Sequence, residues 1–247
     1  MRSVLITGGT GKIGSVLVKS MVQEGHQVMF TTRSKKSGNE MIDKFNLNTE
    51  KCTPIELDFK DADALKNLRS QIKNLPDTLI HNARSLETLR LDKNGRINSE
   101  QFQTEFFNGI TFPYHINNLM LDLKAPLRDV LFISSIYGNV APNPSLYENF
   151  ELESPVNYGV TKAAQIHLVK ELAVRLSPKK IRVNAISYGG VEGRVDAEFK
   201  KRYRKLTPLG GMLEYKDLYP PVKYLLDNYD LKVTGENLKV DGEWTVW

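Results

Sequence analysis

This chain of 247 residues has a single cysteine and no long apolar run. Its single cysteine, Cys52, excludes an internal disulfide and a cysteine metal cluster. No apolar run approaches the roughly 20 residues of a membrane-spanning helix, so we expect no membrane span. The first residues run directly into a glycine-rich turn, which predicts a first strand and not a signal peptide. These absences favour a globular protein of the reducing cytoplasm.

The charge excess is modest and dispersed. The formal net charge is +5, without a basic tail or zinc-finger spacing, so we do not expect nucleic acid as a partner. An anionic small substrate or cofactor accounts for the same excess. The four histidines have no metal-site spacing, and we predict no metal ligand among them.

A glycine turn follows the first apolar run. Residues 3–7 predict a strand, positions 8–14 read Gly-Gly-Thr-Gly-Lys-Ile-Gly, and a helical pattern begins at once. Strand, glycine turn and helix form the context of a dinucleotide fingerprint, because glycines let the backbone approach a pyrophosphate and the helix start offers free N–H groups. A tight strand-to-helix turn without a ligand is the alternative.

The end of the second predicted strand, residues 27–32, bears on cofactor choice. An NAD-selective domain would carry Asp or Glu here for the ribose 2′-hydroxyl, whereas this chain has Thr32 and then Arg33. A missing carboxylate beside an arginine indicates a 2′-phosphate, hence NADP(H). Lys12, in the glycine turn, adds a second cation for the same phosphate. The alternative is a solvated basic loop.

Tyr158 and Lys162 stand four residues apart in an apolar pattern that predicts one amphipathic helix. Positions i and i+4 share a helix face, so the ammonium would lie near the phenol and could lower its pKa. Such a pair suits proton transfer to or from a substrate oxygen. Taken alone, a surface pair explains the same spacing.

The whole chain, 1–247, predicts one domain. Apolar runs at 3–7, 27–32, 53–59, 77–82, 128–134, 180–187 and 238–241 alternate with helical patterns, including a long one at 99–123. This alternation predicts an α/β fold, a Rossmann-like doubly wound parallel sheet of about seven strands flanked by helices. Ligands bind such sheets at the carboxyl ends of the strands. Ser135 and Asn82 stand at two such ends and the glycine turn at a third.

These features together resemble the short-chain dehydrogenase/reductase family over essentially the whole chain. The matching features are Thr7-Gly8 to Gly14, Asp58, Asn82-Ala83, Asn108, Ser135, Tyr158 with Lys162, Val183-Asn184 and Val240-Asp241-Gly242. The resemblance implies a catalytic set of Asn108, Ser135, Tyr158 and Lys162. With Arg33, it implies cofactor contacts from Gly8, Thr10, Gly11, Lys12, Ile13, Gly14, Arg33, Asp58, Asn82, Tyr158, Lys162 and Val191.

The resemblance also implies a mechanism. Tyr158 would donate a proton to the alkoxide formed by hydride transfer from NADP(H), and Ser135 would hydrogen-bond the substrate oxygen. Lys162 would bond the nicotinamide ribose, and Asn108 would hold a water that links Lys162 to solvent. The family is commonly dimeric or tetrameric through its long helices, which implies a homodimer or homotetramer. The apolar tail from Trp244 to Trp247 could pack against a neighbour.

Four departures from the family pattern mark this chain. The glycines at 8, 11 and 14 have the spacing of the family's longer branch, and Arg84 stands where glycine is usual. Tyr188 replaces a proline, and Gly193 replaces the threonine that often holds the nicotinamide amide. The last two put the substrate-side and nicotinamide contacts in question.

A second resemblance narrows the substrate class. The interval from Ser135 to Tyr158 and the end Gly242-Glu243-Trp244-Thr245 resemble oxidoreductases of bacterial surface-sugar gene clusters. Cations between Arg194 and Lys205 lie where the family builds a substrate lid, so Arg202 and Arg204, with Arg84, could meet the phosphate or carboxylate of an activated sugar. A solvated helix face is the alternative for this run.

We therefore expect an NADP(H)-dependent oxidoreductase that acts on a sugar or sugar derivative, such as a sugar phosphate or nucleotide sugar. Two other functions stay open at this point. One is epimerase or dehydratase chemistry with retained cofactor, which the glycine spacing allows. The other is a catalytically silent NADP-binding regulator.

Overall fold

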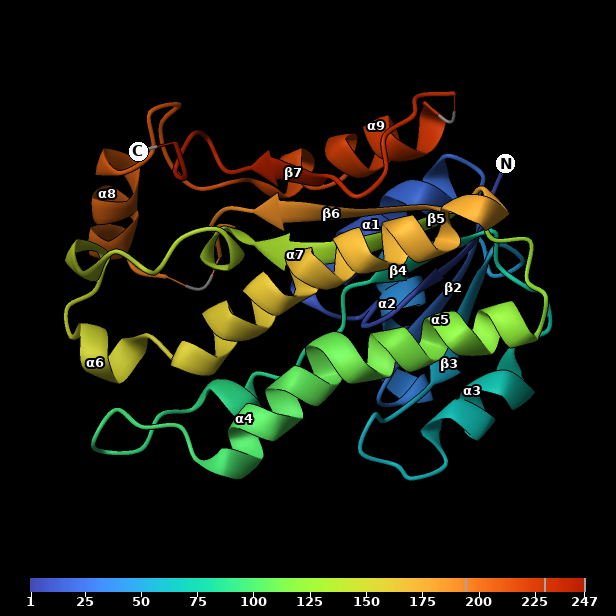
Figure 1. The fold of residues 1–247 in the computed structure, drawn as a ribbon, viewed down its shortest axis with the longest axis horizontal. Coiled ribbons are helices and arrows are strands. Elements are labelled where there is room, and N and C mark those ends of the chain that lie inside the picture. Colours follow the sequence, from blue (N-terminus) through green and yellow to red (C-terminus); the bar gives the residue numbers. More distant parts are fainter. Residues whose placement is uncertain (194, 229, 247) are drawn as a thin grey trace.

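The computed structural model describes residues 1–193, 195–228 and 230–246 (Figure 1). The strands described there form one parallel seven-stranded sheet in the order β3-β2-β1-β4-β5-β6-β7. They are β1 (Ser3–Ile6), β2 (Gln27–Thr32), β3 (Cys52–Glu56), β4 (Thr78–His81), β5 (Asp129–Ser135), β6 (Arg182–Tyr188) and β7 (Asn237–Val240). The order reverses between β1 and β4, which is the switch point where doubly wound sheets bind ligands. The predicted fold class is confirmed.

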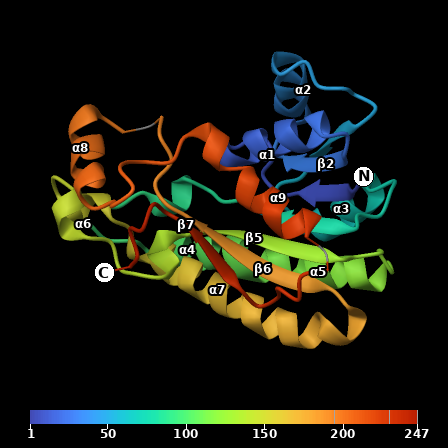
Figure 2. The same cartoon turned by 90° about the horizontal axis from the view of Figure 1, so that it is seen from above.

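Helices cover both faces of the sheet (Figure 2). One face carries α1 (Lys12–Gln23), α2 (Lys35–Lys44) and α9 (Pro220–Asp227). The other carries α3 (Ala64–Gln71), α4 (Ser99–Phe106), α5 (Phe112–Asp122) and α7 (Val156–Leu176). Two short helices, α6 (Phe150–Glu153) and α8 (Ala197–Lys205), lie beyond the carboxyl ends of β5 and β6 (Figure 1).

Each face has its own hydrophobic core. Leu17, Met21 and Phe30 pack with Val222 of α9 on one side. Phe132 packs with Ile116 of α5 and with residues of α7 on the other. Every residue of β5 and of β6 is buried, which is why β5 appears in the sequence as a mostly apolar run, whereas β6 also buries the polar residues Arg182, Asn184 and Ser187.

The predicted third strand is too long at its carboxyl end. β3 ends at Glu56, and the Leu57 N–H still bonds the Thr32 carbonyl before the chain turns. Asp58 then closes that turn, because its Oδ1 accepts from the Lys60 N–H at 3.0 Å. Asp61 accepts from the Asp63 N–H at 2.9 Å just ahead of α3, so the aspartates shape the turn, while Asp63 at the helix start makes no capping hydrogen bond with its side chain.

The long helix predicted at 99–123 is interrupted. A π-helical turn, Phe107–Thr111, separates α4 from α5. Pro113 lacks an N–H and cannot donate the α-helical bond to Gly109, which explains a break at this point. A Cβ at Gly109 would lie 2.5 Å from Thr161 Cγ2, so glycine also lets this turn approach α7 closely.

The helix predicted around Tyr158 and Lys162 is present as α7, but its first half does not bury the apolar residues of the pattern. The first turns bury polar side chains, whereas Val160 is 45% exposed. The buried polar residues of this half are Asn157, Thr161, Lys162 and Gln165. Such a face is costly to bury unless it is hydrogen-bonded, which marks this part of α7 as a functional wall and not as core.

An ionic cluster closes the amino edge of the sheet. Asp129 accepts from Arg2 Nη1 at 2.7 Å and lies 2.7 Å from Arg182 Nη2. The Arg182 guanidinium also donates to the Leu225 carbonyl at 2.8 Å. The cluster therefore fastens the end of α9 to β1, β5 and β6, on the edge opposite the glycine turn.

Candidate active site

The glycine turn between β1 and α1 is shaped as an anion cradle. Gly8 has φ +69°, and a Cβ there would lie 2.8 Å from the Ala83 Cα. A Cβ at Gly14 would lie 2.2 Å from the Gly8 carbonyl oxygen. α1 begins with neither an acidic residue in its first turn nor a side chain capping its N–H groups. The first turn of α1 therefore offers N–H donors to a phosphate that approaches the turn.

Asn82 holds this turn from the end of β4. Its Nδ2 donates to the Thr7 and Gly8 carbonyls at 3.1 and 3.0 Å, and its backbone N–H donates to Thr7 Oγ1. Thr10 contacts Thr32 at the end of β2, with their hydroxyls 3.4 Å apart. Ile13 packs against the adjacent core. The structure thus brings the predicted residues of this motif together around one turn.

Arg33 and Asp58 line a common cavity of about 410 Å³ beyond β2 and β3. The Arg33 side chain is 77% exposed and lies 4.0 Å from Glu87. Glu56 lines the same cavity and accepts from the N–H of Lys35, the first residue of α2. This cavity lies on the adenine side of the switch point, as the sequence predicts for a dinucleotide.

Lys12 lies on the other side of the turn from Arg33. Its Nζ donates to the Val191 carbonyl at 2.6 Å and lies 5.9 Å from the centre of the Tyr215 ring. Val191 follows β6, whereas Arg33 follows β2 on the opposite side of β1. Lys12 therefore points toward the chain after β6 in this structure, and its contribution to a 2′-phosphate site stays a prediction.

Tyr158, Lys162 and Ser135 meet at the carboxyl end of β5. The Lys162 Nζ lies 5.9 Å from the centre of the Tyr158 ring. Ser135 ends β5, and a Cβ at Gly138, in the turn after it, would lie 2.8 Å from the Lys162 carbonyl. The turn that carries Ser135 therefore packs directly on the turns of α7 that carry the pair.

The Lys162 ammonium is buried, with the residue 7% exposed. It donates to the Ile133 carbonyl at 2.8 Å and to Gln165 Oε1 at 3.1 Å. Burial, and after it the Arg84 guanidinium, lower the pKa of Lys162 to about 7, while Glu105 opposes the change. The Tyr158–Lys162 pair is therefore not the solvated surface pair that its spacing alone allowed.

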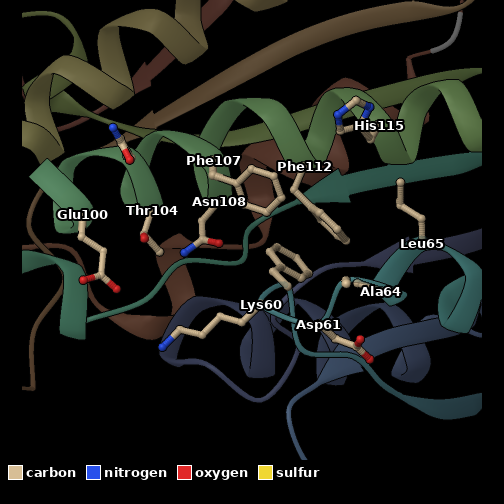
Figure 3. Close-up of a pocket in the computed structure, with 13 residues that line it drawn as sticks. Lys60, Asp61, Ala64, Leu65, Glu100, Thr104, Phe107, Asn108, Phe112 and His115 are labelled. Carbon is tan, nitrogen blue, oxygen red and sulfur yellow. The ribbon is translucent and has the colours of Figure 1, made fainter.

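Asn108 lies apart from this pair. It is in the π-helical turn, and its side chain lines a cavity of about 660 Å³ between that turn and the loop before α3. Figure 3 shows its amide pointing into this cavity, with Lys60 across from it and Phe107 beside it. The link from Lys162 to the π-helical turn runs through Gln165, whose Nε2 donates to the Gly109 carbonyl at 3.1 Å.

The short chain dehydrogenase family matches residues 2–204. The chain belongs to this family. The match takes in the glycine turn, Asn82, Ser135 and the Tyr158–Lys162 pair, and it confirms the resemblance stated from those motifs.

Three proteins illustrate what this chain is similar to within and beyond the family match. Post-translational flagellin modification protein A of Campylobacter coli is 36% identical over 121 residues, which are 49% of this chain and 47% of that protein. The chain thus matches about half the length of that relative. The 3-oxoacyl-acyl-carrier-protein reductase FabG of Aquifex aeolicus is 26% identical over 252 residues, covering 96% of this chain and 95% of that one. A short chain dehydrogenase from Leptospira borgpetersenii, solved with bound NAD+, has a TM-score of 0.82 at 28% identity and covers 99% and 93% of the two chains.

Of the departures from the short chain dehydrogenase pattern, Arg84 is the one that enters the site. Its guanidinium carbon lies 5.0 Å from the centre of the Tyr158 ring. Within the described part of the chain it makes neither a hydrogen bond nor an ion pair. Tyr188, in contrast, is 2% exposed, donates to the Leu218 carbonyl and packs in the core, where burial raises the pKa of its hydroxyl.

Gly193 is fixed as glycine by its surroundings. Its φ is +112°, and a Cβ would lie 3.0 Å from Tyr215 Oη and 3.7 Å from Lys12 Nζ. The positive φ and the close Tyr215 hydroxyl both disfavour a side chain at 193, whereas Lys12 is at an ordinary contact distance. No motif in the sequence points to Tyr215, which comes 22 residues later in the chain.

The cations of α8 are mostly engaged inside the chain, and Arg194 lies outside the described residues. Arg202 donates from Nε to the Leu146 carbonyl at 2.7 Å and lies 3.7 Å from Glu148. It therefore fastens α8 to the loop before α6, and its role as a substrate contact stays a prediction. Lys200 pairs with Glu192 at 3.2 Å, whereas Arg204 is exposed.

Trp244 packs within its own chain, where it is buried, whereas Val246 of the same tail is exposed. Its ring stacks on Tyr203 of α8 at 4.4 Å between centroids. Tyr203 continues through Phe199 to Tyr147, whose hydroxyl lies 2.7 Å from that of Tyr137. This aromatic row ends beside the candidate active site, because the Tyr137 ring lies edge-on to Tyr158 at 6.3 Å. Trp247 lies outside the described residues.

The described residues hold no group of three or more His, Cys, Asp or Glu that could bind a metal ion. His81 is buried, and its Nε2 lies 3.0 Å from Asn117 Oδ1. Burial lowers the pKa of His81 to about 4. His167 is exposed beside Glu171. Among the described helices, none combines the length and apolarity that crossing a membrane would need.

Proposed function

We propose that this short chain dehydrogenase, residues 1–247, acts as one NADP(H)-dependent domain that interconverts a carbonyl group and a secondary alcohol on a sugar derivative. The observation that carries the proposal is the buried Lys162 ammonium beside Tyr158, at the same sheet edge as the glycine turn. A site for binding alone would not need a buried cation next to a phenol, since such burial is costly.

The protein's residues hold and protonate the substrate. The nicotinamide, when bound, supplies or accepts the hydride. Tyr158 donates its phenolic proton to the substrate oxygen as that oxygen gains charge, and the Ser135 hydroxyl hydrogen-bonds the same oxygen. The Lys162 ammonium stabilises the phenolate that remains, because an opposite charge nearby favours the charged form. Asn108 belongs to the turn that supports Lys162 from behind.

The NADP(H) preference rests on the end of β2. Thr32 and Arg33 stand where an NAD-selective protein would carry a carboxylate, and Arg33 faces a cavity large enough for a ribose phosphate. Equilibrium binding of NADPH and NADH to the purified protein tests this preference. We expect the wild-type protein to bind NADPH more tightly than NADH, and we expect Arg33→Gln to reduce the ratio of these two affinities about tenfold. Equal affinity of wild type for the two cofactors would refute it.

An anionic substrate is supported by Arg84. This guanidinium lies over Tyr158 without an ionic partner among the described residues, so a phosphate or carboxylate of the substrate could pair with it. The relative named for flagellin modification, together with the motifs between Ser135 and Tyr158, supports a sugar as the carrier of that group.

The experiment is a screen of NADPH oxidation with keto-sugars and their phosphates. We expect turnover by wild type, none by Tyr158→Phe, and a KM raised selectively for the anionic substrates by Arg84→Gln. Tightly retained cofactor without net NADPH consumption would instead indicate epimerase or dehydratase chemistry. Unchanged biological activity of Tyr158→Phe would refute the enzymatic proposal and support a regulator.

Assembly and location complete the proposal. We propose a homodimer or homotetramer in the cytoplasm, without nucleic acid or membrane as partner. Exposed apolar side chains on the long helices support self-association, with Val160 and Val174 on α7, Phe106 on α4 and Tyr114 on α5.

A further inference from the structure

Gln165 connects the buried lysine of the site to the π-helical turn. It is 3% exposed and lies three residues after Lys162, on the same side of α7. Its Oε1 accepts from Lys162 Nζ at 3.1 Å while its Nε2 donates to the Gly109 carbonyl at 3.1 Å. Both ends of one buried amide are thus used, one on the ammonium and one on the backbone.

The Gly109 carbonyl is available because of Pro113. In an α-helix this carbonyl would accept from the N–H of residue 113, which proline lacks. Gln165 supplies a donor in its place, and Gly109 lets the turn come close enough to α7 for the bond to form. The interruption of the long helix and the amide of Gln165 therefore belong to one arrangement.

An ammonium has three N–H donors, and Ile133 and Gln165 accept two of them. An amide oxygen interacts more strongly with a charged ammonium than with a neutral amine, so both contacts favour the charged form. The third N–H donor is left for the side of the ammonium that faces the candidate active site. Gln165 therefore both orients Lys162 and favours its charge.

We propose that Gln165 is a positioning residue of this dehydrogenase, which holds the Lys162 ammonium in place beside Tyr158 through a bridge to the Gly109 carbonyl. The role in catalysis rests on the proposed function, whereas the bridge itself does not. Nothing in the spacing of the catalytic motifs pointed to Gln165, and its partner in the turn is the backbone of Gly109 and not the side chain of Asn108.

The other charged groups around Lys162 define the background of the test. Arg84, after β4, disfavours its charge, and Glu105, on α4, favours it. Tyr158, on α7 itself, has its ring centre 5.9 Å from the Lys162 Nζ. Removing the Gln165 acceptor leaves these groups in place, so Gln165→Leu isolates the amide.

The test measures the pKa of Lys162 directly, by NMR titration of protein labelled with 13C at lysine Cε, with Lys162→Met assigning the signal. We expect Gln165→Leu to lower this pKa by roughly one unit or more, since it removes a hydrogen bond to a charged group. Gln165→Glu keeps the acceptor and adds a negative charge, so it should raise the pKa. Thr161→Val is the matched control, because it deletes a buried hydroxyl without a partner one position before Lys162.

A Lys162 pKa in Gln165→Leu equal to that in wild type and in Thr161→Val overturns the inference. The same holds if Gln165→Glu lowers the pKa as Gln165→Leu does, because the acceptor would then have no effect. If Gln165→Leu does not fold, Gln165→Glu and Thr161→Val still decide the matter. Failure of wild type to bind NADPH or NADH would refute the proposed function and leave the titration result standing.

Discussion

Lys12→Met should weaken cofactor binding through one phosphate and not through the adenosine. Lys12 opens α1, where a pyrophosphate would approach the glycine turn, and its Nζ already faces Val191 on the nicotinamide side. The second phosphate of a dinucleotide, the one nearer the nicotinamide, is thus the group within its reach. Methionine keeps a similar side-chain length and removes the charge.

The size of the effect follows from two hydrogen bonds. A bond from an ammonium to a phosphate contributes roughly 1.5–3 kcal/mol, and Lys12 must first give up its bond to the Val191 carbonyl, worth about 1 kcal/mol. The net of about 0.5–2 kcal/mol corresponds to a roughly two- to thirtyfold rise in Kd. Added salt should reduce the difference between wild type and variant, since salt screens partly exposed charges.

The assay is calorimetric titration with AMP, ADP and NADPH. Lys12→Met should bind AMP as wild type does and lose affinity for ADP and NADPH, and Lys12→Arg should restore most of the loss. Lys19→Met is the matched control, with the same substitution on the same helix and a lysine that faces the Phe45 ring instead. Equal loss for AMP and ADP, or no loss at all, would refute the assignment of Lys12 to the second phosphate.

Three further predictions concern stability and assembly. Lys162→Met should have a higher melting temperature than wild type below about pH 7 and lose this advantage as the pH rises toward 10.5, because the folded lysine releases its proton near pH 7 whereas the unfolded lysine keeps it. Differential scanning calorimetry across pH measures this, and a difference in melting temperature that stays constant with pH would contradict it. Asp129→Asn should lower the free energy of unfolding in urea by about 3–5 kcal/mol, since it leaves two buried guanidinium groups without their carboxylate. A decrease below about 1 kcal/mol would show that the cluster contributes little to stability. Val174 on α7 is 76% exposed, and Val174→Asp should lower the molar mass measured by light scattering from that of an oligomer to that of a monomer. Lys170→Asp on the same helix is the polar control, and an unchanged mass for Val174→Asp would place the interface elsewhere.

The sheet could be predicted because burial constrains it in a simple way. β5 and β6 are covered on both faces, so their residues must be apolar or internally bonded, and this leaves continuous runs in the sequence. The glycine turn could be predicted for a related reason, since its backbone leaves no room for a Cβ at Gly8 or Gly14. Both features are local in the chain.

The contacts that could not be predicted join residues far apart in the sequence. Lys12 reaches the Val191 carbonyl, 179 positions away, and a flexible lysine could equally have turned toward Arg33. Gln165 reaches Gly109, 56 positions away. Helical spacing does place Gln165 beside Lys162, but no periodic signal shows which of the buried polar residues of α7 bonds the ammonium. For this reason the apolar pattern mispredicted the buried face of that helix.

Backbone conformation accounts for one of the departures from the family pattern. The family often has threonine at position 193, which here is glycine with φ +112°, a conformation that L side chains rarely adopt. A Cβ there would lie 3.0 Å from Tyr215 Oη, so the tyrosine would have to shift by a few tenths of an ångström. Lys12 Nζ lies 3.7 Å from the same place, which is ordinary van der Waals contact. A threonine at 193 would therefore strain the backbone and press on the Tyr215 hydroxyl while leaving Lys12 on the Val191 carbonyl.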